Sequence, residues 1–338
     1  GRRPATRAAA LKIFPTIGNF LSSSTQVVAS ERALVGVGLR RGPAAPVAMD
    51  DVLTSSPLLD WDLLDAIGKG SYGSVHRARL KRVGTLAAIK TIALEDNDNE
   101  IASLSQDVVR EVETLKKCAH AAVLGYLGAY IFDRKLWLVT ELCEGGSVLD
   151  VMRQRNAPLD ERQVTAVAAS SIVALSYLHS QRITHRDVKA ANLLLTASGQ
   201  LKLADFGVSV ELTNALATRS TAIGTPHWMA PEVVQEGQYD EKADLWSLGI
   251  TIIEVAQMLP PHWDVRPVVR VLLRIPSAPP PTLQHPMKWS HHLIDWLKLC
   301  LKKEPSERPT AAELSRHALV ASVGDAETVI LDESATRL

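Results

Sequence analysis

Three glycines with the spacing Gly-x-Gly-x-x-Gly, from Gly68 to Gly73, lie between two segments typical of β-strands. In a dinucleotide-binding site such glycines open a helix, and a Walker-type loop also ends in Gly-Lys-Ser/Thr. Here the residues from Ser74 to Arg77 continue as a strand instead. The pattern therefore predicts a glycine-rich turn between two strands, whose backbone N–H groups can fold over a triphosphate.

The secondary-structure pattern changes at the dipeptide Gly145-Gly146, which we interpret as a hinge. Before it, the sequence predicts a β-hairpin with a turn at 81–84, an amphipathic helix over 107–117, and extended runs over 124–132 and 135–142. After it, helical periodicity predicts helices over 148–155, 161–179, 244–258, 290–301 and 311–319. The fold class expected is α+β, with a small β-rich lobe and a larger helical lobe.

A lysine and a glutamate in the first part form a candidate pair. Lys90 follows Ala88 on the second strand of the hairpin, and Glu111 lies on the apolar stripe of the predicted helix, whereas Glu113 points away from it. A carboxylate on an apolar face requires a cation. We expect Lys90 to be that cation and the pair to direct the ammonium toward phosphates.

Three more motifs follow in a fixed order, and together with the glycine turn they carry a family resemblance. They are His185-Arg186-Asp187-Val188-Lys189-Ala190-Ala191-Asn192, Asp205-Phe206-Gly207 and Ala230-Pro231-Glu232. Unrelated loops would rarely combine all of these motifs in this order. Over residues 60–320 the chain resembles the eukaryotic protein kinases, which implies a two-lobed fold with an ATP cleft between the lobes.

The resemblance implies a set of catalytic and metal-binding residues. Asp187 would orient the substrate hydroxyl or take its proton, and Lys189 would neutralise the moving γ-phosphate, with Lys90 and Glu111 holding the nucleotide. Asn192 and Asp205 would hold Mg²⁺, because phosphoryl transfer requires hard oxygen ligands for the metal. The cofactors implied are ATP and Mg²⁺.

The resemblance also implies an ATP-binding set. Thr140 would guard a pocket behind the adenine, the backbone around Glu141 and Cys143 would pair with the adenine edge, and Ser147 is a candidate ribose contact. The whole set is Ile67, Gly68, Lys69, Gly70, Ser71, Tyr72, Gly73, Val75, Ala88, Lys90, Thr140, Glu141, Cys143, Ser147 and Leu194. The apolar members would also suit an ordinary core.

Other positions bear on the substrate. The Lys189 position and the sequence Gly224-Thr225-Pro226 are similar to serine/threonine rather than tyrosine kinases, with Thr225 expected to position the substrate by bridging Asp187 and Lys189. Structural roles are implied for Asp244, which would accept N–H groups from the catalytic loop, and for Arg308, which would pair with Glu232.

Within the family, residues 224–233 and the loop 189–192 are most similar to the germinal-centre branch of the sterile-20 group, near the Hippo kinases. His227 departs from that branch, which usually has Phe there. In this branch the resemblance implies an activating phosphate at Thr221, with Ser220 and Thr218 as alternatives, and Arg186 as the cation that would pair with it.

Two rival functions share these motifs. A pseudokinase scaffold would bind partners without catalysis, but such proteins usually lack the strand lysine, the loop aspartate or the metal aspartate, and Lys90, Asp187 and Asp205 are all present. A kinase of MAP kinase kinases would share the whole core, and a panel of substrates would separate it.

Charge and composition bound the remaining possibilities. Lys+Arg and Asp+Glu both total 37, so there is no global cationic field to favour nucleic acid, and no apolar run is long enough to span a bilayer. The three cysteines are widely spaced, which indicates reduced thiols and a cytoplasmic location. The expected partners are protein substrates with Ser or Thr acceptors and an upstream or trans-activating kinase.

The ends of the chain differ from its centre. Residues 1–49 hold seven basic residues and one acidic residue, and residues 1–55 are expected to be a disordered head. Residues 1–48 are either an organelle-targeting segment or an extension of a protein that starts at Met49. The expected division is then a lobe over 60–140, a hinge over 141–146, a lobe over 147–320 and a tail over 321–338. We treat the chain as a candidate fragment whose dimerisation would use regions outside it.

Overall fold

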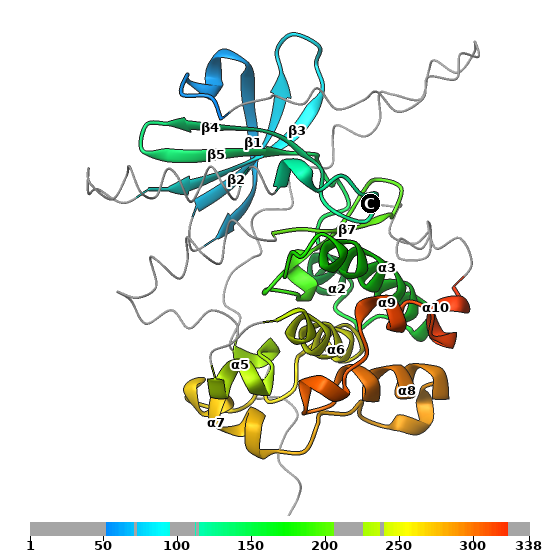
Figure 1. The fold of residues 1–338 in the computed structure, drawn as a ribbon. Coiled ribbons are helices and arrows are strands. Elements are labelled where there is room, and N and C mark those ends of the chain that lie inside the picture. Colours follow the sequence, from blue (N-terminus) through cyan, green and yellow to red (C-terminus); the bar gives the residue numbers. More distant parts are fainter. Residues whose placement is uncertain are drawn as a thin grey trace, which may run out of the picture. The chain divides into compact units, whose positions relative to one another are not determined.

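A computed structural model describes residues 52–70, 73–94, 112, 115–205, 226–236 and 240–323. Its first half forms an antiparallel sheet with the strand order β1-β2-β3-β5-β4 (Figure 1). The strands are β1 (Trp61–Gly70), β2 (Gly73–Leu80), β3 (Leu86–Ala93), β4 (Tyr126–Phe132) and β5 (Lys135–Thr140). Gly70 of β1 pairs with Gly73 of β2, so the glycine motif joins two antiparallel strands as predicted.

Alternation along β3 divides its side chains between a core and a cavity. Ala87 and Ile89 are buried in a small apolar cluster on one face of the sheet. Ala88 and Lys90 point to the other face, where they line a cavity, because successive side chains of a strand alternate in direction. The register with β5 sets Ala88 opposite Thr140. The sheet thereby presents a lysine and small side chains to one space.

The second half is helical, as predicted. Its elements are α2 (Val148–Arg155), α3 (Glu161–Ser180), β6 (Leu193–Leu195), β7 (Leu201–Leu203), α5 (Pro231–Glu236), α6 (Glu241–Gln257), α7 (Val269–Ser277), α8 (His291–Cys300), α9 (Ala311–Leu314) and α10 (Ala318–Ala321). Short 3-10 turns lie at Pro57–Leu59, Ala190–Asn192, Pro226–Trp228, Pro286–Lys288 and Pro305–Glu307. The expected fold of a β-rich and a helical lobe is confirmed.

Helix α6 is the centre of the helical lobe. Every residue from Ala243 to Ala256 is buried, and the helix packs against α2, α3 and α8 (Figure 1). A helix that is apolar on nearly all sides is stable only when other elements surround it. Its few polar side chains are therefore placed in the interior, where they need partners.

Besides shifts of one to three residues at the ends of several elements, the structure differs from the expected organisation in three places. Leu53, assigned to the head, bridges to Tyr130 of β4, donating from its N–H to Ala129 O at 3.0 Å and accepting from Ile131 N at 2.8 Å. The predicted helix over 311–319 is two short helices, because α9 ends at Leu314 and His317 caps the start of α10 by accepting from Leu319 N. Helices α5 and α7 are additional to the prediction.

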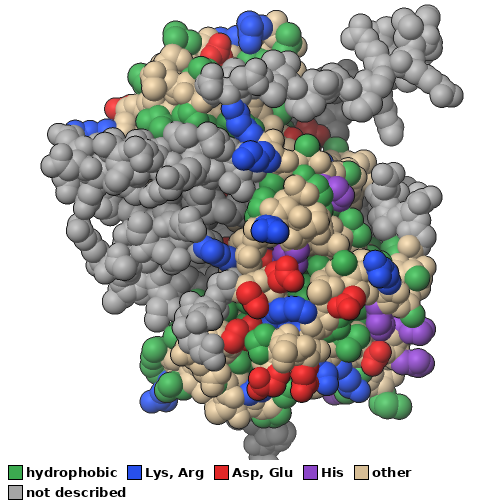
Figure 2. Space-filling view, in the orientation of Figure 1, with side chains coloured by type: hydrophobic (Ala, Val, Ile, Leu, Met, Phe, Trp, Pro, Cys, Tyr) green, Lys and Arg blue, Asp and Glu red, His purple; other side chains and the backbone are tan. Residues whose placement is uncertain are grey.

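In the ranges described, no helix is both long and apolar enough to cross a membrane. On the face shown in Figure 2, acidic and basic side chains lie interspersed over the helical lobe. This distribution agrees with the balanced charge of the sequence.

Candidate active site

A cavity of about 520 Å³ lies between the sheet and the helical lobe. This volume is in the range of small-molecule sites. Twelve of the predicted residues line it together: Ile67, Gly68, Val75, Ala88, Lys90, Thr140, Glu141, Cys143, Ser147, Asn192, Leu194 and Asp205. The apolar members enclose it from the strands and from β6, and two of the polar members, Lys90 and Asp205, contact each other.

The glycine turn lies against β3. A Cβ atom added to Gly73 would come within 1.6 Å of the carbonyl oxygen of Thr91, so only glycine allows the two strands this close. Lys69 and Gly73 lie outside the lining of the cavity, and Ser71 and Tyr72 fall outside the described residues. For Gly70 the structure gives the pairing with Gly73 only. The turn is thus positioned by β3, while Ile67 and Gly68 form the edge of the cavity.

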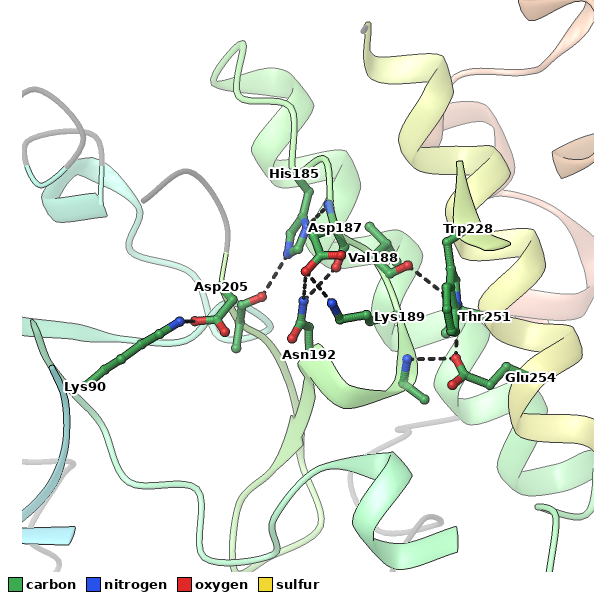
Figure 3. A network of polar contacts seen from close by, with 12 residues as sticks. Lys90, His185, Asp187, Val188, Lys189, Asn192, Asp205, Trp228, Thr251 and Glu254 are labelled. Carbon is green, nitrogen blue, oxygen red and sulfur yellow. Dashed lines mark hydrogen bonds and ion pairs between the residues drawn. The ribbon is translucent and has the colours of Figure 1, made fainter. Parts of the chain in front are cut away.

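Lys90 is paired with the metal-binding candidate. Its Nζ lies 2.8 Å from Asp205 Oδ1 (Figure 3). Partial burial of Asp205 favours its neutral form, but the nearby ammonium of Lys90 outweighs this, and the pKa of Asp205 is lowered below its ordinary value. Asp205 is therefore ionised at neutral pH. Glu111, the expected partner of Lys90, lies outside the described residues.

The predicted catalytic loop brings three side chains together. Asp187 Oδ2 accepts from Lys189 Nζ at 2.7 Å and from Asn192 Nδ2 at 2.9 Å, and Asn192 Nδ2 also donates to Asp187 O at 2.7 Å (Figure 3). These bonds hold the carboxylate in one orientation. They also place an ammonium beside it, as a phosphoryl-transfer site requires.

His185 connects this loop to Asp205. Its Nδ1 accepts from Asp187 N at 3.2 Å, so the proton is on Nε2, which donates to Ala204 O at 2.9 Å. Burial lowers the pKa of His185, although Asp244 and Asp187 act in the opposite direction. The ring is accordingly neutral and links the catalytic loop to the residue before Asp205.

Asp244 of α6 holds the catalytic loop through hydrogen bonds to its backbone. Its carboxylate accepts from His185 N at 2.7 Å, Arg186 N at 2.8 Å and His179 Nε2 at 2.9 Å. Arg186 has a φ of 71°, in the left-handed region that is unfavourable for side chains other than glycine's. The hydrogen bonds that the loop donates to Asp244 compensate for this strain, so the predicted structural role of Asp244 matches its geometry.

The donor set fits a magnesium ion. Asn192 uses its amide nitrogen on Asp187, which leaves the carboxamide oxygen as its ligand group, and Asp205 supplies an ionised carboxylate. The two residues are neighbours, because Ala204 N donates to Asn192 O at 2.9 Å. Carboxylate and amide oxygens are the ligands that Mg²⁺ prefers, usually completed by substrate phosphates.

The segment predicted as the hinge is held by a partly buried ion pair. Glu141 Oε1 accepts from Lys202 Nζ at 2.9 Å and from Gly125 N at 2.6 Å, while Glu141 N donates to Gly125 O at 2.9 Å. The backbone N–H of Glu141 is thus already used, so an adenine would meet other backbone groups of the segment. Ser147 caps α2 and donates from Oγ to Asp150 at 2.6 Å.

Comparison with known proteins identifies the family to which this arrangement of residues belongs. The family model for the protein kinase domain matches residues 61–320. The chain belongs to the protein kinase family. It is 43% identical over 268 residues to serine/threonine-protein kinase cst-1 of Caenorhabditis briggsae, which covers 79% of this chain and 53% of that protein. The same-named protein of Caenorhabditis elegans is 42% identical over 268 residues, covering 79% and 52%.

These matches confirm the sequence-based assignment to the sterile-20 group of protein kinases. The chain spans about half the length of the two curated relatives. The similarity to these relatives therefore concerns the kinase region, and the activity of the complete protein is a proposal.

Other predicted residues of this kinase lie away from the cavity. Arg308 makes a bidentate pair with Glu232, at 2.6 and 2.7 Å, and its side chain is fully buried. The pair joins the Ala-Pro-Glu motif to the segment before α9, as predicted. Thr221 and Thr225 fall outside the described residues, so the partner expected for Arg186 is not among them.

Several lining residues of the kinase were absent from the prediction. Asp150 and Arg153 of α2 reach the cavity, and the capping spacing Ser147-x-x-Asp150 was a signal for the first. Tyr126 lines the cavity from β4, and burial raises the pKa of its hydroxyl to about 12. Nothing in the local sequence distinguishes Tyr126 from an ordinary strand residue.

Proposed function

We propose that this chain is an ATP- and Mg²⁺-dependent protein kinase that phosphorylates serine and threonine hydroxyls of protein substrates in a signalling cascade. The observation that carries the proposal is the convergence of Lys90 and Asp205 with the loop of Asp187, Lys189 and Asn192 beside one cavity. Family membership supports the same reaction.

Each residue has a defined task in this proposal. Asp187 orients the substrate hydroxyl and accepts its proton as the oxygen bonds to the γ-phosphorus, while the bond from that phosphorus to the bridging oxygen breaks and ADP leaves. Lys189 offsets the negative charge on the transferred group, and Lys90 contacts the remaining phosphates. Mg²⁺, held by Asn192 and Asp205, would neutralise phosphate charge.

The preference for serine and threonine is the finer part of the proposal. It rests on Lys189 and on Thr225, which the family pattern assigns to a bridge between Asp187 and Lys189, and on the names of the two relatives, which are both serine/threonine-protein kinases. A scaffold without catalysis is disfavoured because Lys90, Asp187 and Asp205 are all present and two of them form an ion pair.

A transfer assay tests this function. The purified chain is incubated with labelled ATP, Mg²⁺ and myelin basic protein, with the Asp187→Asn variant in parallel, and the labelled amino acids are identified after acid hydrolysis. We expect phosphoserine and phosphothreonine from the wild type only. Predominant phosphotyrosine would contradict the substrate class. No transfer, even after treatment with an activating kinase, would favour the scaffold.

We further propose that phosphorylation of Thr221 activates the enzyme. The phosphate would come from an upstream kinase or from a trans-activating kinase. A phosphothreonine carries a charge near −2, and the guanidinium of Arg186, next to Asp187, is the cation that the family pattern assigns to it. Such a pair would order the segment that contains Thr225.

The variants Thr221→Ala and Ser220→Ala separate the two modification sites. We expect Thr221→Ala to lose most activity and Ser220→Ala to keep it, with phosphate mapped to Thr221 by mass spectrometry. Full activity of Thr221→Ala, or phosphate on Ser220 alone, would refute this switch.

A further inference from the structure

Helix α7 lies at an edge of the helical lobe, away from the sheet, and its outward side is apolar (Figure 1). Val271 and Ile275 are 0% and 5% exposed, so they define the side on which the helix packs against the lobe. Val269 and Leu273 lie on nearly the opposite side, because successive residues of a helix are rotated by 100°, and they are 52% and 75% exposed. A helix at a protein surface normally places polar residues there. The exposed valine and leucine therefore indicate an interaction surface.

A row of arginines runs beside this apolar side. Arg270 and Arg274 are one turn apart on α7, and both are exposed. Arg270 Nη1 donates to the carbonyl oxygen of Arg266 at 3.4 Å, which places Arg266 next to the first turn of the helix. The guanidinium of Arg266 lies 5.7 Å from the centre of the Trp263 ring, and Trp263 is 39% exposed. We define the α7 surface by six residues: Trp263, Arg266, Val269, Arg270, Leu273 and Arg274.

The charge of the α7 surface is opposite to that of the chain around it. Beyond residue 49 the chain holds more acidic than basic residues, whereas residues 265–294 hold four basic residues and no acidic one. Asp264, which is exposed, is the nearest acidic residue in sequence. Charges in water are screened over about 8 Å at physiological ionic strength. An anionic partner that approaches α7 therefore interacts mainly with the arginines.

The apolar side chains decide which anionic partner fits best. Nucleic acid would bind the arginines through its phosphates and leave Val269 and Leu273 in water. An acidic protein would need a groove matched to the protruding Leu273, whereas lipid chains adapt to any protruding side chain. At a membrane with anionic phospholipids, arginines lie at the level of the phosphates while apolar side chains enter the acyl region. Tryptophan is enriched at the same interface. A membrane thus satisfies both rows of the α7 surface.

We propose that the α7 surface binds membranes that contain anionic phospholipids. Val269 and Leu273 insert between the lipid chains, Trp263 lies at the interface, and the three arginines contact headgroup phosphates. Binding of this kind is peripheral and requires no helix that spans the membrane. None of the six residues lines the ATP cavity. The inference therefore goes beyond the proposed phosphoryl transfer and does not depend on it.

Flotation with vesicles tests the proposal in the full chain. We expect the wild type to bind vesicles of phosphatidylcholine mixed with phosphatidylserine much more tightly than vesicles of phosphatidylcholine alone. Arg270→Gln combined with Arg274→Gln keeps long polar side chains but removes two charges. This double variant should lower the partition coefficient about thirtyfold, because each arginine near an anionic surface contributes a factor of about five to six. High salt should reduce the difference between the wild type and this variant.

The apolar part of the contact has its own variant. Leu273→Ser should lower the partition coefficient about tenfold, because it removes the apolar area that enters the membrane. This loss should remain at high salt, since the hydrophobic contribution is not screened. A Leu273→Ser variant that binds like the wild type would overturn the inference.

A matched control removes two charges elsewhere on the helical lobe. Arg162 of α3 and Arg316, between α9 and α10, are both exposed. Arg162→Gln combined with Arg316→Gln should bind vesicles like the wild type. All variants share the basic residues 1–49, so any contribution of that segment is common to them. Equal binding by the control and by the Arg270 and Arg274 variant would overturn the inference, as would a wild type that binds neither kind of vesicle.

A second readout locates the contact on the protein. Lipids brominated near the headgroup end of their acyl chains quench tryptophan fluorescence on contact. Wild-type emission should fall on binding, and most of this quenching should be absent in Trp263→Phe, which keeps an apolar ring and should still bind. Quenching that is the same in Trp263→Phe would place the contact elsewhere and overturn the inference.

Two further outcomes separate this proposal from its alternatives. Binding to poly-glutamate without binding to vesicles would overturn the membrane in favour of an acidic protein partner. Phosphate transfer to a soluble substrate should be unchanged in all variants of the α7 surface. A wild type that binds vesicles but transfers no phosphate would refute the proposed function alone, whereas an active wild type that binds no vesicles would refute the membrane contact alone.

Discussion

The ammonium of Lys90 lies 2.8 Å from the carboxylate of Asp205, so a strand of the sheet and the segment after β7 share one ion pair at the cavity. The two residues are 115 positions apart in sequence. Asp205 also has a φ of 62°, a conformation that costs free energy in a residue with a side chain. The ion pair helps to hold this strained position.

Loss of either charge should abolish most phosphoryl transfer. We expect Lys90→Met and Asp205→Ala each to lower turnover of myelin basic protein by at least about a hundredfold, because electrostatic stabilisation dominates this reaction. Lys135→Met, on an exposed strand end, is the matched control and should be near wild type. Circular dichroism should show a retained fold. Turnover within tenfold of wild type in either variant would contradict the assignment.

The Arg308 pair should be a major contributor to stability. Removing one partner leaves a buried charge unpaired, so Arg308→Ala should lower the free energy of unfolding by about 3–5 kcal/mol. Arg316 is exposed, and Arg316→Ala should change it by less than about 0.5 kcal/mol. Urea unfolding of both variants measures the difference. Similar midpoints for the two would show that the pair is dispensable.

His227 should make the protein sensitive to acid. Burial, Arg266 and His262 lower the pKa of His227, although a backbone hydrogen bond with His262 opposes them. As the pH falls below about 6.5, His227 binds a proton more readily in the unfolded chain than in the folded one. The free energy of unfolding therefore decreases as the pH falls. His227→Phe removes this linkage.

We therefore expect the melting temperature of His227→Phe to exceed that of the wild type by a margin that grows between pH 7 and pH 5. The packing should tolerate the change, because His227 already contacts the rings of Trp228 and Trp263. A margin that is constant with pH would exclude His227 as the titrating group.

Glu254 should have the opposite linkage. Its pKa is raised from 4.5 to about 7 by burial, with Lys189 and Arg153 as the charged groups that act against this. The folded state therefore keeps a proton that the unfolded chain releases, and stability declines as pH rises through this window. Between pH 4.5 and pH 8, the free energy of unfolding of the wild type should fall by on the order of 3 kcal/mol relative to that of Glu254→Gln. Thermal unfolding at several pH values measures this, and parallel curves would contradict it.

Truncation should separate the head from the kinase fold. A protein that starts at Met49 keeps the bridge from Leu53 to β4 and should retain full specific activity. A protein that starts at Pro57 loses both hydrogen bonds of Leu53 and should melt several degrees lower. Equal melting temperatures would show that this bridge adds no stability.

Sequence patterns were most informative where a residue type has only one structural use. The glycine at position 73 and the helix over 148–155 were predictable because close strand approach and capping are local requirements. The two hydrogen bonds that the Glu254 carboxylate accepts could not be predicted, since helical periodicity treats a polar residue on an apolar face as an exception. Its partners Ala190 and Trp228 come from segments up to 64 residues away, and only the folded chain brings them together.

The burial of α6 on all sides has a consequence for dynamics. Residues 243–256 can exchange their amide hydrogens with solvent only when the surrounding helices separate, so these amides should be among the slowest to exchange in the helical lobe. The backbone of the catalytic loop is anchored to side chains of this most protected helix. Local openings at the periphery, in α7 or α10, would therefore leave the geometry around Asp187 intact, and its loss would coincide with global unfolding.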